Sequence, residues 1–280
     1  MFRRTSGSSL CYACGKLNRV DAAVCFYCGR RNPGLWGFGP ALGRLVGRVD
    51  LARVVTLVCV VAYVASLALD PGAIFQPRGV FSILAPSGRA LYTLGMTGAG
   101  AIETGRWWTL LTAIYLHGSL LHIAFNLLWI RDLAPPVEEL YGRARAVVIF
   151  TAGGVGGFLL SNWATGAPTI GASGAVFGLL GAMVAYGWRR GGFYGMAVFR
   201  QYWQWSLILL VMGFLMPGVN NLAHAGGFVG GFATAFALGY SERRSEGGAD
   251  RILAALTVLV TVVAFALAIW TTVASMAGRL

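Results

Sequence analysis

The residue of this chain best suited to chemistry is a serine flanked by glycines. Ser173 lies in the run Gly171-Ala172-Ser173-Gly174 and opens an apolar segment that ends before two arginines. Small residues in membrane helices are often helix contacts, so packing alone would explain a serine here. The alternative is a nucleophile that a peptide backbone can reach inside a bilayer.

A histidine in a second apolar segment, His224, is the candidate general base for that serine. Gly227 and Gly231 follow it by three and seven residues and therefore share its face of a helix. Glycines leave this helix face without side chains, and Gly174, Gly178 and Gly181 do the same for the serine's own helix. Two helices that meet at such glycine faces can bring their backbones close together. The hydroxyl would then come within hydrogen-bond reach of the imidazole.

A third polar group lies between residues 117 and 126. His122 and Asn126 are four residues apart, so they share one helix face and are candidate donors to an oxyanion. The backbone N–H of Ser173 is a further donor, because the start of a helix favours negative charge. A structural hydrogen bond between helices would also explain His122 and Asn126. We assign His117 a structural role.

The distribution of the acidic residues limits the type of catalysis. None of the ten Asp and Glu falls between Glu139 and Glu242, the interval that holds both Ser173 and His224. A triad needs a carboxylate to hold the imidazole, and this interval offers none. The only lysine is Lys16, near the N-terminus, and the histidines form no H-E-x-x-H motif. A Ser–His dyad with the histidine as general base is what remains.

The elements that must position these residues are membrane helices. The chain is 57% hydrophobic and only 11% charged, whereas a soluble domain carries roughly 25% charged residues. About 20 apolar residues are needed to cross the hydrocarbon. We predict seven spans, at residues 54–69, 119–133, 146–163, 173–188, 203–216, 220–240 and 252–276.

Positive residues predict the orientation of these spans. Nine of the 22 Lys and Arg lie in the N-terminal arm, and nine more lie in or beside loops that alternate onto the same side. We therefore expect a multi-pass protein of a bacterial inner (plasma) membrane, with its N-terminus cytoplasmic and its C-terminus outside. The net charge of +12 then reflects orientation and contact with anionic lipid, with no nucleic-acid partner.

Four cysteines near the N-terminus have the spacing of a metal site. Cys11-x-x-Cys14 and Cys25-x-x-Cys28 are each followed by a glycine. This spacing lets four thiolates converge on one ion, and we expect a structural zinc. Two disulfides are the alternative, but a reducing cytoplasm disfavours them. Residues 32–50, rich in Gly, Pro and Arg, are predicted to be a linker.

Taken together, these motifs resemble the rhomboid family of intramembrane serine proteases. The resemblance covers about residues 51–245 and rests on four motifs in family order: Arg106-Trp107-Trp108, the run His117 to Asn126, Gly171-Ala172-Ser173-Gly174, and Ala223-His224 with Gly227 and Gly231. It implies Ser173 as the nucleophile and His224 as the base, with His122 and Asn126 stabilising the oxyanion. It further implies that catalysis needs no cofactor. Substrates would be single-span membrane proteins.

The resemblance also implies the fold, and together with the cysteine spacing it divides the chain into predicted parts. We expect an all-α polytopic membrane protein, a rhomboid-like six-helix bundle plus one C-terminal transmembrane helix (6+1). The predicted parts are a zinc-ribbon-like cytoplasmic domain (1–31), a basic linker (32–50), the rhomboid protease core (51–245) and the extra helix (246–280). What the ribbon contacts is left open. Two rival hypotheses are a catalytically inactive rhomboid-like protein that binds membrane helices and a small transporter or channel.

Overall fold

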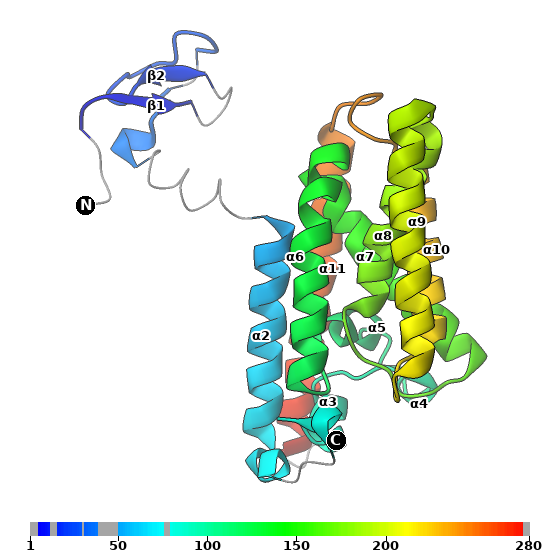
Figure 1. Cartoon of the computed structure of the whole chain (residues 1–280). Coiled ribbons are helices and arrows are strands. Elements are labelled where there is room, and N and C mark those ends of the chain that lie inside the picture. Colours follow the sequence, from blue (N-terminus) through cyan, green and yellow to red (C-terminus); the bar gives the residue numbers. More distant parts are fainter. Residues whose placement is uncertain (1–4, 12–15, 30, 39–49, 76–78, 277–280) are drawn as a thin grey trace. The chain divides into compact units, whose positions relative to one another are not determined.

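The computed structural model describes residues 5–11, 16–29, 31–38, 50–75 and 79–276 (Figure 1). The chain divides into two compact units, Met1–Asp50 and Leu51–Leu280.

The first unit is built on a small antiparallel hairpin. Strand β1 (Ser8–Leu10) pairs with β2 (Leu17–Arg19), and a 3-10 turn, η1 (Leu35–Gly37), follows. The inward positions of the two strands, Ser9 and Asn18, are buried opposite each other. The described part of this unit buries few apolar side chains, among them Val20, and a small unit of this kind usually needs a metal or disulfides for stability.

The second unit is helical. Its described part contains seven helices of eighteen residues or more: α2 (Leu51–Leu69), α6 (Leu120–Tyr141), α7 (Arg143–Ala164), α8 (Ser173–Arg190), α9 (Gly192–Leu215), α10 (Asn221–Leu238) and α11 (Gly248–Met276). Short elements join α2 to α6: η2 (Pro71–Phe75), η3 (Val80–Ser82), α3 (Gly88–Thr93), α4 (Ala99–Glu103), α5 (Thr109–Thr112) and η4 (Ala113–Tyr115). Figure 1 shows α2 and α6 running alongside each other, and α8 enclosed by α7, α9 and α10.

Several of these helices have the character of membrane spans. By length and composition, α2, α7 and α11 could each cross a bilayer. The segments Thr109–Tyr115 and Leu120–Tyr141 would form a fourth span if taken together, bent by 93° at their junction. The protein is therefore an integral, multi-pass membrane protein. The predicted total of seven spans stays a prediction, because among the described helices α8, α9 and α10 do not qualify as spans by length and hydropathy alone.

Two helices extend well beyond the predicted spans. Helix α6 continues through Pro135 and Pro136 to Tyr141, where the sequence predicted an end at residue 133. Its last turns are held by burial, and the Tyr141 hydroxyl donates to the carbonyl of Ala182 at 2.9 Å. Helix α9 begins at Gly192 rather than at residue 203. Its first turns pack on the end of α8, where a Cβ on Gly187 would lie 2.7 Å from the Gly195 carbonyl oxygen.

Helix α8 is the centre of the unit, because every residue from Gly174 to Gly187 is buried. Glycines let its backbone touch two neighbours. A Cβ on Gly153 of α7 would lie 2.7 Å from the Gly178 Cα, and a Cβ on Gly227 of α10 would lie 2.8 Å from the Gly174 Cα. The predicted close approach of the serine helix and the histidine helix is thus confirmed.

A buried ion pair joins α11 to the rest of the unit. Arg145 of α7 donates to Asp250 of α11 at 2.9 Å, and neither side chain is more than 2% exposed. The same guanidinium donates to the carbonyls of Gly239, Arg244 and Ser245, which precede α11. The composition-based prediction of the last helix did not anticipate this anchor.

Candidate active site

Ser173 is the first residue of α8, at the end of a tightly held loop. Gly171 has φ +119°, a conformation that disfavours residues with a Cβ. Its N–H donates to the carbonyl of Ala113 at 2.9 Å. The serine side chain is partly exposed to a cavity of about 630 Å³. The chain therefore places its hydroxyl at an open position on an otherwise buried helix.

His224 lies in the first turn of α10 and faces the same cavity. Its ring stacks on Phe177 of α8, with the ring centroids 4.4 Å apart and the planes 15° apart. Phe177 follows Ser173 by four residues, so the stack holds the imidazole against the serine's own helix face. The Nδ1 atom of His224 is buried and has no hydrogen-bond partner. Within the described residues, no carboxylate is hydrogen-bonded to His224.

Ser173 and His224 share the cavity but are not hydrogen-bonded. Among the described residues, no bond within 3.5 Å links the serine hydroxyl to the imidazole. The backbones of the two helices are in contact one residue from the serine, at Gly174, and three residues from the histidine, at Gly227. Because the two backbones are held together here, rotation of the Ser173 or His224 side chain alone changes the distance between the hydroxyl and the imidazole. The dyad itself stays a prediction.

His122 is placed as a donor beside the serine loop. Its Nδ1 accepts a hydrogen bond from the Gly118 N–H at 3.2 Å. A neutral imidazole that accepts at Nδ1 carries its proton on Nε2. The ring covers Gly171, because a Cβ there would lie only 2.7 Å from Nε2. The N–H of Nε2 is therefore next to the loop that leads into Ser173.

Asn126 lies one turn after His122 and lines the same cavity. Its side chain is 2% exposed, and Nδ2 donates to the His122 carbonyl at 2.8 Å. One N–H of this amide is used within the helix, which leaves the second for another acceptor. His117 is fully buried and does not line the cavity. Its Nδ1 donates to the carbonyl of Tyr115 at 3.2 Å, in keeping with a structural role.

The predicted outer-loop motif folds against α3. Arg106 donates to the Tyr92 carbonyl at 2.9 Å, and its guanidinium lies 4.4 Å from the centre of the Tyr92 ring. The next residues, Trp107 and Trp108, pack edge to face. None of the three lines the cavity, so this motif shapes the loop rather than the site.

Sequence reasoning missed a hydrogen-bonded set of polar side chains, two of which, Thr169 and Asn220, line the cavity. Asn220, Ser161 and Thr169 are hydrogen-bonded to one another at the junction of α7, the serine loop and α10. The available signal was an asparagine directly before an apolar helix, which is typical of an N-cap. That signal predicts the cap but not its partners, which come from distant parts of the chain.

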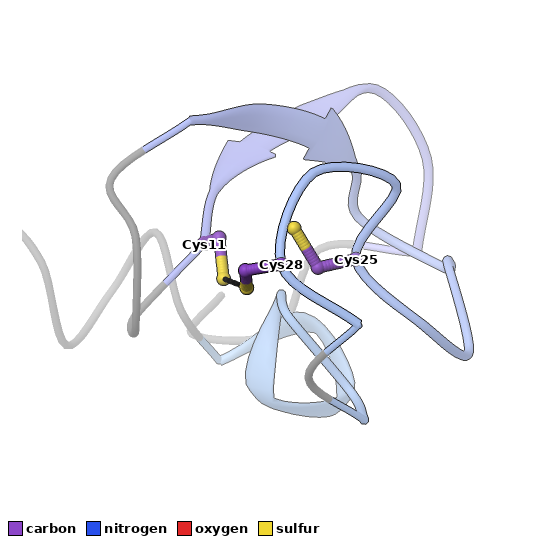
Figure 2. Close-up of side chains that lie close together, drawn as sticks. All are labelled: Cys11, Cys25 and Cys28. Carbon is purple, nitrogen blue, oxygen red and sulfur yellow. Dashed lines mark hydrogen bonds between the residues drawn. The ribbon is translucent and has the colours of Figure 1, made fainter.

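Three of the four predicted metal ligands lie together in the first unit (Figure 2). The Sγ atoms of Cys11, Cys25 and Cys28 lie within 4.8 Å of one another, and those of Cys11 and Cys28 are 3.8 Å apart. Four sulfurs about 2.3 Å from a tetrahedral zinc would be roughly 3.8 Å apart, so this spacing fits the ion. The fourth predicted ligand, Cys14, lies outside the described residues.

The thiol of Cys25 is prepared for ionisation. Burial alone would raise its pKa. Hydrogen bonds from the backbone N–H groups of Cys28 and Tyr27, from the Cys28 thiol and from Asn18 outweigh that effect and lower the pKa to about 6. The Asn18 amide donates to Cys25 Sγ at 3.3 Å. A thiolate is the form that binds zinc.

The chain is thus a multi-pass helical membrane protein whose cavity brings Ser173 together with His122, Asn126 and His224, and known proteins are similar to it in sequence. The Rhomboid domain matches residues 104–241 of the chain. Rhomboid protease GluP of Bacillus subtilis (strain 168) is 33% identical over 191 residues, which are 66% of this chain and 37% of GluP. YdcA of the same organism, which also carries the rhomboid name, is 30% identical over 138 residues, 48% of this chain and 69% of YdcA.

The chain belongs to the rhomboid family. RHOMBOID-like protein 5 of Arabidopsis thaliana is a further relative, 34% identical over 172 residues, or 59% of this chain and 54% of that protein. The chain thus spans about a third to a half of the length of GluP and of the plant relative. Ser173, His224, His122 and Asn126 all fall within the matched domain.

Proposed function

We propose that this protein is an intramembrane serine endopeptidase that cleaves transmembrane segments with a Ser173–His224 dyad. The observation that carries the proposal is the shared cavity. It brings a serine at a helix start together with two histidines and an asparagine from two other helices. Membership of the rhomboid family and the relative named rhomboid protease GluP support the reaction class.

In the proposed mechanism, Ser173 Oγ attacks the scissile carbonyl and His224 accepts the hydroxyl proton. The imidazolium then donates that proton to the leaving amine, and an acyl-enzyme remains on the serine. Water enters, loses a proton to His224 and releases the carboxylic product. The buried Nδ1 of His224 has no acid to orient it, so the stack on Phe177 performs that role.

The negative charge of the tetrahedral intermediate requires donors. The Nε2–H of His122 lies beside Gly171, two residues before the nucleophile, and the backbone N–H of Ser173 is unbonded within its first helical turn. The free N–H of the Asn126 amide supplies a third donor. These three groups come from two helices, so the loss of one leaves the others.

We infer that the substrates are single-span membrane proteins. Apart from its polar residues, the cavity is lined by apolar side chains of α6 and α9, among them Leu128, Trp129 and Met212. An apolar wall accepts a membrane helix, while the polar end accepts its unwound backbone. A substrate that keeps its helix intact would have no free carbonyl to present.

The proposed topology is six rhomboid helices plus α11, with the N-terminus in the cytoplasm and the C-terminus outside a bacterial inner membrane. The excess of Lys and Arg on one side supports this orientation. The same charges would contact anionic membrane lipid.

We propose a structural zinc held by Cys11, Cys14, Cys25 and Cys28. When bound, the ion would supply folding free energy to the first unit. The Sγ atoms of Cys11 and Cys28 have the separation of two zinc ligands, 3.8 Å, all three described sulfurs lie within 4.8 Å of one another, and the hydrogen bond from Asn18 would hold Cys25 in place. Catalysis itself requires no cofactor in this proposal.

Labelling of the purified protein in detergent with a fluorophosphonate probe tests the proposed nucleophile. We expect wild-type protein to label, and Ser173→Ala and His224→Ala to remain unlabelled with unchanged helical content. Labelling of Ser173→Ala at the wild-type level would overturn the assignment. A wild-type protein that neither labels nor cleaves a single-span substrate would favour the alternative, an inactive rhomboid-like protein that binds membrane helices.

A further inference from the structure

Asn220 joins three separate parts of the fold through its side chain. Its Nδ2 donates to Ser161 Oγ at 2.6 Å and to Thr169 Oγ1 at 2.9 Å, and these two hydroxyls are 3.3 Å apart. Ser161 belongs to the end of α7, Thr169 to the loop before Ser173, and Asn220 directly precedes α10. Both N–H groups of the amide are therefore used between elements.

The cluster continues toward the outer loop on the far side of Thr169. Thr97 and Thr169 exchange two backbone hydrogen bonds, at 3.2 and 2.8 Å. The Thr97 hydroxyl is in turn hydrogen-bonded to Thr109 and accepts from the Asn162 amide, both at 3.2 Å. Thr97, Thr109 and Ser161 are all 1% exposed or less. Apart from Asn162 Oδ1, which is buried without a partner, the side chains of this network are hydrogen-bonded to one another or to the backbone, and breaking such a buried bond is costly.

The network reaches both halves of the proposed dyad at the same sequence distance. Thr169 precedes Ser173 by four residues, and Asn220 precedes His224 by four. At the other end of its side chain, Asn220 Oδ1 accepts from the N–H of Ala223, and its backbone carbonyl accepts from the N–H of His224. Since no acid orients the imidazole, the position of this first turn decides where the ring lies.

We propose that Asn220 is a positioning residue, whose two side-chain N–H groups hold the loop that carries Ser173 against the helix turn that carries His224. This inference rests on the proposed dyad. Loss of the bridge would let the loop and the turn separate. A misplacement of about 1 Å can reduce a catalysed rate about 100-fold, so we expect a kcat roughly 10- to 100-fold lower.

Two substitutions separate bridging from simple helix capping. Serine is a good N-cap, so Asn220→Ser keeps the bond to Ala223, but it is too short to reach both hydroxyls. Thr169→Val removes the acceptor from the opposite side and leaves the cap untouched. We expect both variants to lose kcat on a reconstituted single-span substrate with KM changed less than about twofold, and Thr169→Ser to restore the rate.

The double variant Asn220→Ser/Thr169→Val gives the sharpest result. If the two residues act through one bond, the double variant should be little slower than either single variant. Thr234→Val is the matched control, because Thr234 lies on α10 and bonds only within its own helix, to the Gly230 carbonyl. It should keep the wild-type rate. Thermal unfolding of each variant identifies losses that come only from instability.

Wild-type kcat in Thr169→Val would overturn the proposal, even if Asn220→Ser were slow or failed to fold, because capping would then be the only role. A double variant whose fold-loss in kcat equals the product of the two single losses would also overturn it, because the two residues would then act independently. Failure of the proposed dyad looks different: cleavage would persist in Ser173→Ala, whatever happens at Asn220.

Discussion

The contact between Gly227 and Gly174 sets the distance between the two halves of the proposed dyad. A Cβ on Gly227 would lie 2.7 Å from the Gly174 carbonyl carbon and 2.8 Å from its Cα. Carbon atoms pack at about 3.5 to 4.0 Å. Gly227→Ala must therefore push α10 from α8 by at least about 0.8 Å, next to the serine and one turn from the histidine.

We expect Gly227→Ala to reduce kcat about 100-fold, because a shift near 1 Å at the reacting groups is worth about that much. Overpacking should also destabilise the fold by about 1–3 kcal/mol. The assay is cleavage of a single-span substrate in proteoliposomes, with thermal unfolding measured on the same preparations.

Gly100→Ala is the matched control, since Gly100 is a helical glycine with no atom within 4 Å of the added Cβ. It should retain the wild-type rate and stability. If Gly227→Ala cleaves within about twofold of wild type, the helix contact does not control the dyad and the reasoning is refuted.

Three further predictions follow from other contacts. Phe177→Ala removes the ring that stacks on His224 and should lower kcat in the cleavage assay. Phe177→Leu should recover part of the rate. Equal rates for wild type and Phe177→Ala would contradict this role. Arg145→Met removes the buried one of the two arginines that pair with Asp250 and leaves Arg244; it should destabilise the fold by about 2–3 kcal/mol, seen as a lower Tm, whereas an unchanged Tm would count against the anchor. Zinc binds thiolates, and although the pKa of Cys25 is lowered to about 6, ordinary thiols titrate at about 8.5. Zinc affinity, measured by competition with a chromophoric chelator, should therefore weaken steadily as the pH falls from 8 to 5, and an affinity independent of pH over that range would argue against thiolate ligation.

The local parts of the fold could be predicted from composition and spacing. The apolar segments gave α8 and α10 nearly correctly, and the glycines at three- and four-residue spacing predicted their contact, because small residues on one helix face have few other uses. Helix ends were harder to predict. The Pro135-Pro136 pair predicts a break, but burial of Val137 and Tyr141 carries α6 past it.

The site was predictable where one residue type carries the chemistry, and not where the chemistry depends on contacts across the chain. Ser173, His224, His122 and Asn126 stand out as polar groups in apolar segments, and the structure brings all four to one cavity. The roles of Phe177 and Asn220 depend on neighbours from other elements. A phenylalanine in an apolar helix carries no local signal that a histidine will stack on it.

Cleavage of a single-span substrate by purified protein in proteoliposomes is the most direct test of the proposed activity. We predict that wild type cuts within the transmembrane segment, that Ser173→Ala and His224→Ala reduce the rate to background, and that chelation of zinc leaves the rate of wild type measurable. Cleavage by Ser173→Ala at a rate comparable to wild type, or a cut that requires a metal in the membrane unit, would contradict the Ser–His mechanism.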